Sequence, residues 1–151
     1  MNATVRALWA KTRIALWPGD YLLVSLPHDA LKQAALLAAA GADQFAALVV
    51  EKEGVSLTLP RKAWAEASQK FHALAAAGPY RVVTLDLEID LNVSGYLLPA
   101  AERLAQAGIA IVAQCAFRMD HLLIRSEDAK TAVSILKRFA AACAGAENAP
   151  G

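Results

Sequence analysis

The sequence predicts an α+β protein built from two copies of one small unit. Short runs in which apolar and polar residues alternate, typical of strands, take turns with longer runs of helical periodicity. Both halves of the chain show these runs in the same order: strand, helix, strand, strand, helix. Tyr21-Leu-Leu-Val-Ser-Leu opens the first copy and Tyr80-Arg-Val-Val-Thr-Leu the second, with aromatic, aliphatic and hydroxyl residues at matching positions. The pattern therefore indicates an internal duplication.

The first unit is expected at residues 20–77, after a helical arm at residues 1–19. Apolar residues at helical spacing occupy 4–16, and Trp17-Pro18-Gly19 ends that pattern. The unit itself is predicted to contain a strand at 21–26, a helix at 29–40, strands at 45–50 and 55–59 joined by a turn at 51–54, and a helix at 61–76.

The second unit is expected at residues 78–143, with a flexible tail at 144–151. Apolar and polar side chains alternate strictly along its first strand, which indicates one buried and one polar face. Its predicted elements are a strand at 80–89, a helix at 96–107, strands at 109–117 and 121–124, and a last helix that Ser126 caps.

Composition excludes several classes of protein. Apolar residues make up 57% of the chain and charged residues 19%, which supports a packed core and argues against disorder. The net charge of +1 argues against a nucleic-acid binder, which normally shows a basic excess on one face. The sequence shows neither a secretory signal nor an apolar run long enough to span a membrane. We therefore expect a soluble cytoplasmic protein without nucleic-acid or membrane partners.

No pattern in the sequence names a reaction. The three histidines are scattered, and there is no phosphate-binding loop, dinucleotide fingerprint or nucleophile beside an evident base. Asp86, Glu88 and Asp90 share one strand face and suit a divalent cation, but a solvated sheet face explains them equally well. We expect no metal, no cofactor and no enzymatic activity.

The loop Asn92-Val93-Ser94-Gly95 has two interpretations. Asn92 or Ser94 is a suitable helix cap, with Gly95 relieving crowding between helix and strand. Alternatively, the glycine lets the backbone approach a ligand, and the amides of a starting helix attract a carboxylate. An amino group would then pair with Asp90 or Asp120. The residues alone leave both interpretations open.

The ordered segments "GPYRVVTL", "NVSGYL", "AERLAQAGI" and "DHLLI" resemble ACT-domain proteins, in particular the small bacterial group with two ACT-like units in one chain. "YLLVSLP" and "GVSLTLP" resemble the first unit of that group, so the resemblance covers roughly residues 20–142. It implies two ferredoxin-like (ACT-type) βαββα units packed as a tandem sandwich. It also implies association through sheet edges, hence a homodimer, and binding of amino acids where units meet.

The resemblance implies a site between the loop at 92–95 and the strand end at 115–120 of an adjacent unit. Its expected ligand-binding residues are Asn92, Val93, Ser94, Gly95, Cys115, Phe117 and Asp120. Cys115 and Ala116 stand where relatives often carry hydroxyl residues or glycine, so the ligand of this chain is either different or absent. The implied function is a non-enzymatic regulatory module that binds a small metabolite such as an amino acid. The alternative is a protein-association module without a ligand.

Overall fold

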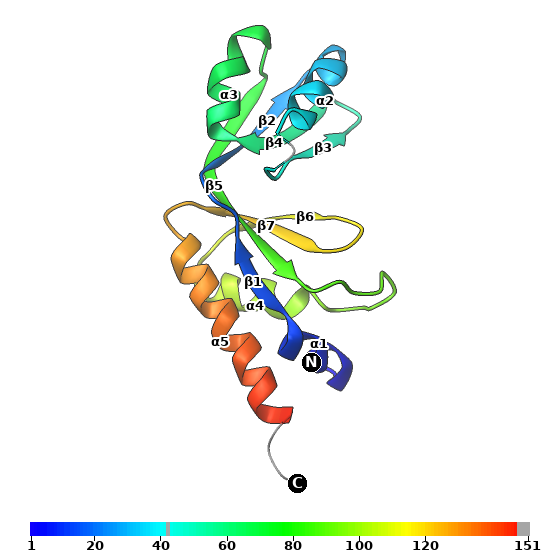
Figure 1. Cartoon of the computed structure of the whole chain (residues 1–151), viewed down its shortest axis with the longest axis vertical. Helices are drawn as coiled ribbons and strands as arrows, with labels where there is room; N and C mark the ends of the chain where they lie inside the picture. The colour runs from blue at the N-terminus through cyan, green and yellow to red at the C-terminus, as the bar shows by residue number, and fades with distance from the viewer. Residues whose placement is uncertain (42, 148–151) are drawn as a thin grey trace. The chain divides into compact units, whose positions relative to one another are not determined.

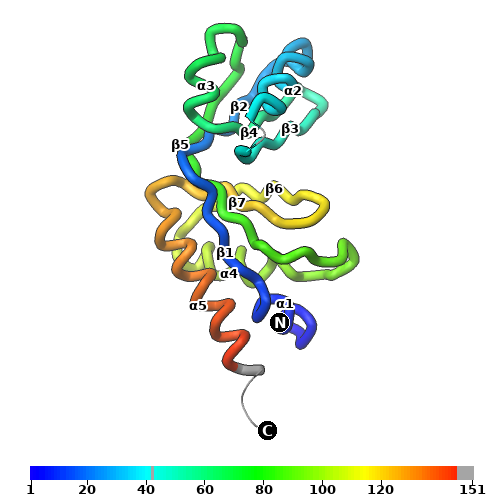
Figure 2. The backbone as a smooth tube through the Cα atoms, viewed as in Figure 1, coloured from blue at the N-terminus to red at the C-terminus, as the bar shows by residue number. Residues whose placement is uncertain are grey.

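The computed structural model describes residues 1–41 and 43–147, and the chain folds into two compact units (Figure 1). Unit 1 combines Met1–Leu16 with the chain from Val83 onward, and unit 2 is the segment Trp17–Val82 between them. The first and last helices of the chain thus belong to the same unit, as the trace in Figure 2 shows.

Unit 2 is a four-stranded antiparallel sheet covered by helices. Its sheet has the order β3-β4-β2-β5, in which β5 contributes its first half. Chain and sheet order together give the βαββαβ arrangement of a ferredoxin-like unit. Leu57, Leu59 and Trp64 are among the residues of its core. The elements are β2 (Tyr21–Leu26), the 3₁₀ turn η1 (His28–Ala30), α2 (Leu31–Ala39), β3 (Ala47–Val50), β4 (Val55–Pro60), α3 (Arg61–Ala67), the 3₁₀ turn η2 (Ser68–Lys70) and β5 (Ala75–Asp86).

Unit 1 has the same kind of sheet, but its edge strand comes from the N-terminus. The sheet order is β1-β5-β7-β6, with the second half of β5 between β1 and β7. Trp9, Leu104 and Leu136 are fully buried in its core. The elements are α1 (Ala3–Lys11), β1 (Arg13–Leu16), the second half of β5, α4 (Leu98–Gln106), β6 (Ile111–Cys115), β7 (Asp120–Arg125) and α5 (Ala129–Glu147).

Several predicted elements differ from the structure in their bounds, and two predicted helices include segments that form strands. Residues 4–16 were predicted to be helical throughout, but α1 ends at Lys11 and residues 13–16 form β1, which pairs with β5 from Arg13↔Asp86 to Leu16↔Val83. The helix predicted to reach residue 76 ends at Ala67, a 3₁₀ turn follows, and β5 begins at Ala75. In both places, pairing with a distant strand takes precedence over local helical periodicity.

The boundary between the units lies inside β5, between Val82 and Val83, because this strand serves both sheets. The segment expected to be an N-terminal helical arm thus supplies β1 to unit 1. At the other end α5 continues to Glu147, into the segment expected to be a tail, and residues 148–151 lie outside the described residues. The predicted α+β class is confirmed.

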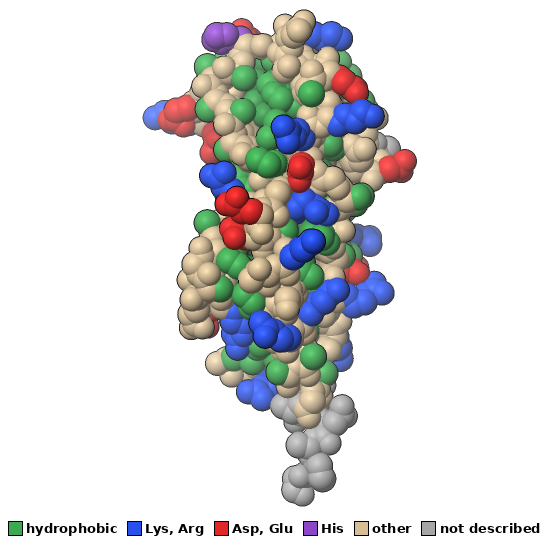
Figure 3. Space-filling view, turned by 90° about the vertical axis from the view of Figure 1, so that its left-hand side faces the viewer, with side chains coloured by type: hydrophobic (Ala, Val, Ile, Leu, Met, Phe, Trp, Pro, Cys, Tyr) green, Lys and Arg blue, Asp and Glu red, His purple; other side chains and the backbone are tan. Residues whose placement is uncertain are grey.

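Both charge signs occur on the surface. On the face drawn in Figure 3, blue Lys and Arg side chains predominate over the part that belongs to unit 1. The chain as a whole carries only one excess positive charge, so this face does not represent the whole surface. No helix among the described residues combines the length and the apolar character that crossing a membrane requires.

Candidate functional site

The loop that follows β5 begins with a turn held by Asp90. The backbone N–H and the side-chain Nδ2 of Asn92 donate to Asp90 Oδ1 at 2.8 and 2.9 Å. The N–H of Val93 donates to the Asp90 carbonyl oxygen at 3.0 Å. Such an Asx turn is the local alternative to a helix cap that Asp and Asn side chains favour. The turn occupies Asp90 Oδ1 and fixes the start of the loop.

The end of the loop leaves several backbone donors without a protein acceptor. The N-cap of α4 is Leu97, with no side-chain capping bond, so the predicted capping role of Asn92 or Ser94 is wrong. Gly95 has φ of +80°, a conformation that side chains rarely adopt, and it turns the chain into the helix. Within the described part of the chain, the amides of residues 94–98 donate to no protein group. Uncompensated N–H groups at a helix start attract anions.

The second wall of the site is the hairpin between β6 and β7. Cys115 pairs with Asp120 in the last ladder position, and the N–H of Ala116 donates to the Met119 carbonyl oxygen at 3.0 Å. Phe117 stands at the tip with 78% of its surface exposed. Arg118 Nη1 lies 3.6 Å from Glu88 Oε2, and both side chains are exposed.

The loop and the hairpin together line a pocket of about 260 Å³. Five of the seven predicted residues line it: Val93, Gly95, Cys115, Phe117 and Asp120. Asn92 and Ser94 are exposed and are not part of its lining. The strand end was expected from an adjacent unit, but here both segments belong to unit 1. One chain therefore already brings the two predicted segments together.

Tyr96 lines the pocket but was not predicted from the sequence. It is 3% exposed and lines the pocket beside Gly95. An aromatic residue directly after the loop glycine was the only signal in the sequence. Arg118 and Met119 of the hairpin also line the pocket.

Two ionisable side chains near Asp120, those of Cys115 and Tyr96, have raised pKa values and are therefore neutral at pH 7. Partial burial, with a further effect of the hydrogen bond to Asp120 and its charge, raises the pKa of the Cys115 thiol to about 11. Burial also raises the pKa of Tyr96 to about 12, and the charge of Asp120 adds to the effect. Burial lowers the pKa of the adjacent His121, whereas the charge of Asp120 acts in the opposite direction. The thiol is therefore a protonated donor at neutral pH and not an activated nucleophile.

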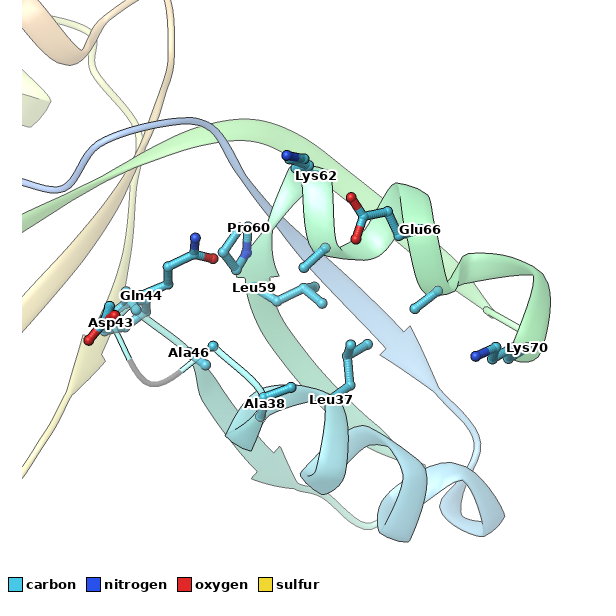
Figure 4. A pocket seen from close by; sticks show the side chains of 15 residues that line it. Leu37, Ala38, Asp43, Gln44, Ala46, Leu59, Pro60, Lys62, Glu66 and Lys70 are labelled. Atoms are coloured by element: carbon cyan, nitrogen blue, oxygen red, sulfur yellow. The ribbon is translucent and has the colours of Figure 1, made fainter.

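A larger cavity, of about 570 Å³, lies in unit 2 between α2 and α3 (Figure 4). Its apolar lining includes Leu37 and Leu59, while Lys62, Glu66 and Lys70 follow one another along the side formed by α3 and η2. It contains none of the predicted site residues. We favour the smaller pocket because it combines uncompensated amides with a carboxylate, which together select a ligand by its chemistry.

The described residues contain no group of three or more His, Cys, Asp or Glu side chains placed to hold a metal ion. The three acidic side chains that share one predicted strand face each interact with another protein group: they are Asp86, Glu88 and Asp90. Arg13 Nη2 donates to Asp86 Oδ2 at 2.7 Å, Glu88 faces Arg118, and Asp90 holds its own turn.

An α+β unit with this sheet order is a ferredoxin-like domain. A family model of the ACT domain matches residues 76–138, from the start of β5 to about the middle of α5. The resemblance is therefore confirmed for this segment, whereas the match does not extend over residues 20–75. No curated protein matches the chain.

Solved structures share the fold of nearly the whole chain. A Vibrio cholerae protein of unknown function, described as a possible transport protein, is 24% identical, with a TM-score of 0.70 over 90% of this chain and 95% of that one. An Agobacterium tumefaciens protein is 19% identical, with a TM-score of 0.65 over 85% and 89%. The regulatory subunit of Thermus thermophilus aspartate kinase is 12% identical, with a TM-score of 0.59 over 85% and 97%. These likenesses show an ACT-type fold.

Proposed function

We propose that this chain is a non-enzymatic, ACT-like regulatory module that binds an amino acid in the pocket of unit 1. The observation that supports this proposal is the pairing of uncompensated amides at residues 94–98 with the Asp120 carboxylate around one small cavity. An α-amino acid carries the two complementary charges on adjacent groups.

The proposed pose follows from charge. The ligand's carboxylate accepts hydrogen bonds from the amides that precede and start α4, where the helix dipole also favours a negative charge. Its ammonium group pairs with Asp120. Its side chain lies against Phe117 and Met119 of the hairpin. A volume of about 260 Å³ is below the range of drug-sized sites and so favours a small metabolite.

The comparisons support the regulatory part of the proposal. The matching family model is that of the ACT domain, and one solved structure of similar fold is described as the regulatory subunit of an aspartate kinase. Another, 18% identical, is Escherichia coli aspartokinase III in complex with aspartate and ADP.

We further propose that the module is a homodimer. β6 forms one edge of the unit 1 sheet and ends at Cys115, which lines the pocket. A second copy that pairs with this edge would place its own residues beside the hairpin, which is how the expected interface between units would arise.

The exposed edge of the unit 2 sheet favours the alternative, an association module without a ligand. β3 is an edge strand of unit 2, and Val49 and Val50 on it are 48% and 56% exposed. An apolar, unprotected edge strand is a ready surface for strand pairing with another chain.

Titration calorimetry with the twenty common amino acids tests the proposal. At least one should bind, and at one hundred times its dissociation constant it should stabilise the chain by about 2.7 kcal/mol if it binds only the folded form. Asp120→Asn should weaken binding at least tenfold because it removes the negative charge that pairs with the ammonium group. Glu102→Gln, at an exposed position on α4, is the matched control and should bind as the wild type does.

A second pair of variants tests the loop. Gly95→Ala and Gly108→Ala introduce the same strain, because both glycines have positive φ and open space where a Cβ would stand. Only Gly95→Ala should abolish binding, since Gly108 lies at the other end of α4. A dimer by light scattering with no heat from any amino acid would favour the association module instead.

A further inference from the structure

The N-terminal helix α1 contacts Tyr96 through Trp9. The indole Nε1 of Trp9, which can only donate, gives a buried hydrogen bond of 2.9 Å to the Tyr96 carbonyl oxygen. The two rings are stacked with their centroids 5.4 Å apart. Trp9 is fully buried and also packs on Phe139 of α5, with the two ring centroids 4.9 Å apart. The carbonyl directly before the N-cap of α4 is thus fixed by a residue 87 positions away in the sequence.

Thr12 holds the other end of the same side chain. Its Oγ1 lies 2.7 Å from the Tyr96 hydroxyl and 2.9 Å from the Leu8 carbonyl oxygen. A carbonyl oxygen only accepts, so the single proton of the Thr12 hydroxyl is directed to Leu8. The Tyr96 hydroxyl is therefore the donor to Thr12. Its high pKa, about 12, keeps that proton in place at neutral pH.

Close packing of the side chains does not by itself require the two hydrogen bonds to Tyr96. Thr12 is a buried polar residue, 6% exposed, and a buried hydroxyl that loses its partner is costly. Both contacts converge on Tyr96, which lines the pocket together with Gly95 and Leu97. The hydrogen bonds with Trp9 and Thr12 thus connect the N-terminal segment to a residue that lines the pocket.

We propose that Trp9 and Thr12 are positioning residues for the pocket of unit 1: by clamping Tyr96 at its carbonyl and its hydroxyl, they set the geometry of the loop at 94–98 and hence the affinity for an amino acid. This inference rests on the proposed function for its ligand. It adds that the N-terminal segment, which touches no ligand, governs binding.

The first test reads the loop without any ligand. Thr12→Val removes the hydroxyl at nearly constant volume, and Thr12→Ser restores it. In two-dimensional amide NMR spectra of the full chain, Thr12→Val and Trp9→Phe should shift or broaden the resonances of Gly95 and its neighbours. Thr12→Ser should return them to their wild-type positions, and the Gly54 resonance of unit 2 should not move. Trp64→Phe, a comparable change in the core of unit 2, is the control and should leave Gly95 unchanged.

The second test uses the amino acid that binds best in the titration of the wild type. Thr12→Val and Trp9→Phe should weaken its binding at least tenfold, whereas Thr12→Ser and Trp64→Phe should change it less than twofold. Unchanged Gly95 resonances in Thr12→Val would overturn the inference, and so would unchanged affinity with shifted resonances. If no amino acid binds the wild type, the proposed function fails, and a selective shift at Gly95 that Thr12→Ser reverses still supports the positioning role.

Discussion

The junction between the first strand, the first helix and the hairpin is open in unit 1 and closed in unit 2. The hairpins themselves are alike, because the N–H of Ala116 donates to Met119 in one and the N–H of Glu51 donates to Gly54 at 2.8 Å in the other. The connections differ. Residues 87–97 form a long loop between β5 and α4, whereas Pro27 and the turn η1 are all that join β2 to α2.

Main-chain atoms fill the junction of unit 2. A Cβ added at Gly54 would overlap the Leu26 carbonyl oxygen, so the hairpin backbone lies directly on the end of β2. His28 Nε2 adds a hydrogen bond of 2.8 Å to the Lys52 carbonyl oxygen. The two units thus share a sheet order, but this junction holds a pocket where the connection is long and a close backbone contact where it is short.

The largest expected effect is at the closed junction. Gly54→Ala should lower the free energy of unfolding by about 1–3 kcal/mol, because the backbone atoms that meet the new methyl group cannot move aside easily. Gly41→Ala is the matched control: its methyl group would make ordinary contacts with Gln44, so the change should stay within about 0.5 kcal/mol. Urea unfolding followed by tryptophan fluorescence measures both, and equal midpoints would show that the junction is not tightly closed.

A smaller effect is expected at the polar bridge of the same junction. His28→Ala removes the bond to Lys52 and should cost about 0.5–1 kcal/mol, since the bond is exposed and its loss is partly compensated by water. His72 is exposed and makes no hydrogen bond to any residue that the structure describes, so His72→Ala should have no measurable effect. The same unfolding curves decide this pair.

The pH dependence of stability should report His121 of unit 1. Its Nδ1 lies 2.8 Å from Thr84 Oγ1, and burial lowers its pKa below the ordinary 6.5. The unfolded chain then binds a proton at higher pH than the folded chain does, so stability should fall as the pH drops below about 6.5. His121→Asn should show a smaller loss between pH 7.5 and 5.5 than the wild type. An equal loss in both proteins would contradict the assignment.

The smallest expected effect is on the rate at which the Cys115 thiol is alkylated. With a pKa raised to about 11, Cys115 should react with iodoacetamide at pH 8 more slowly than an ordinary thiol, although the residue is exposed. Asp120→Asn should accelerate the reaction severalfold, because it removes the negative charge that disfavours the Cys115 thiolate. Peptide mass spectrometry distinguishes Cys115 from the buried Cys143, and an unchanged rate in Asp120→Asn would show that the two groups do not interact.

Sequence periodicity predicted the α+β class and most elements because strands and amphipathic helices are local patterns. The loop was recognisable from Asn92, Ser94 and Gly95, and the hairpin from its spacing. The pairing of β1 with β5 was not predictable, since Arg13 and Asp86 meet only after the chain folds. For the same reason Tyr96 was missed, because its role depends on Trp9 and Thr12 in the distant N-terminal segment.

The most direct test of the open junction is an NMR titration of the full chain with the amino acid that binds best by calorimetry. We expect shifts at Gly95 and along residues 116–120, with Gly54 and residues 27–30 of unit 2 unaffected. Shifts confined to unit 2, or none with any amino acid, would contradict it.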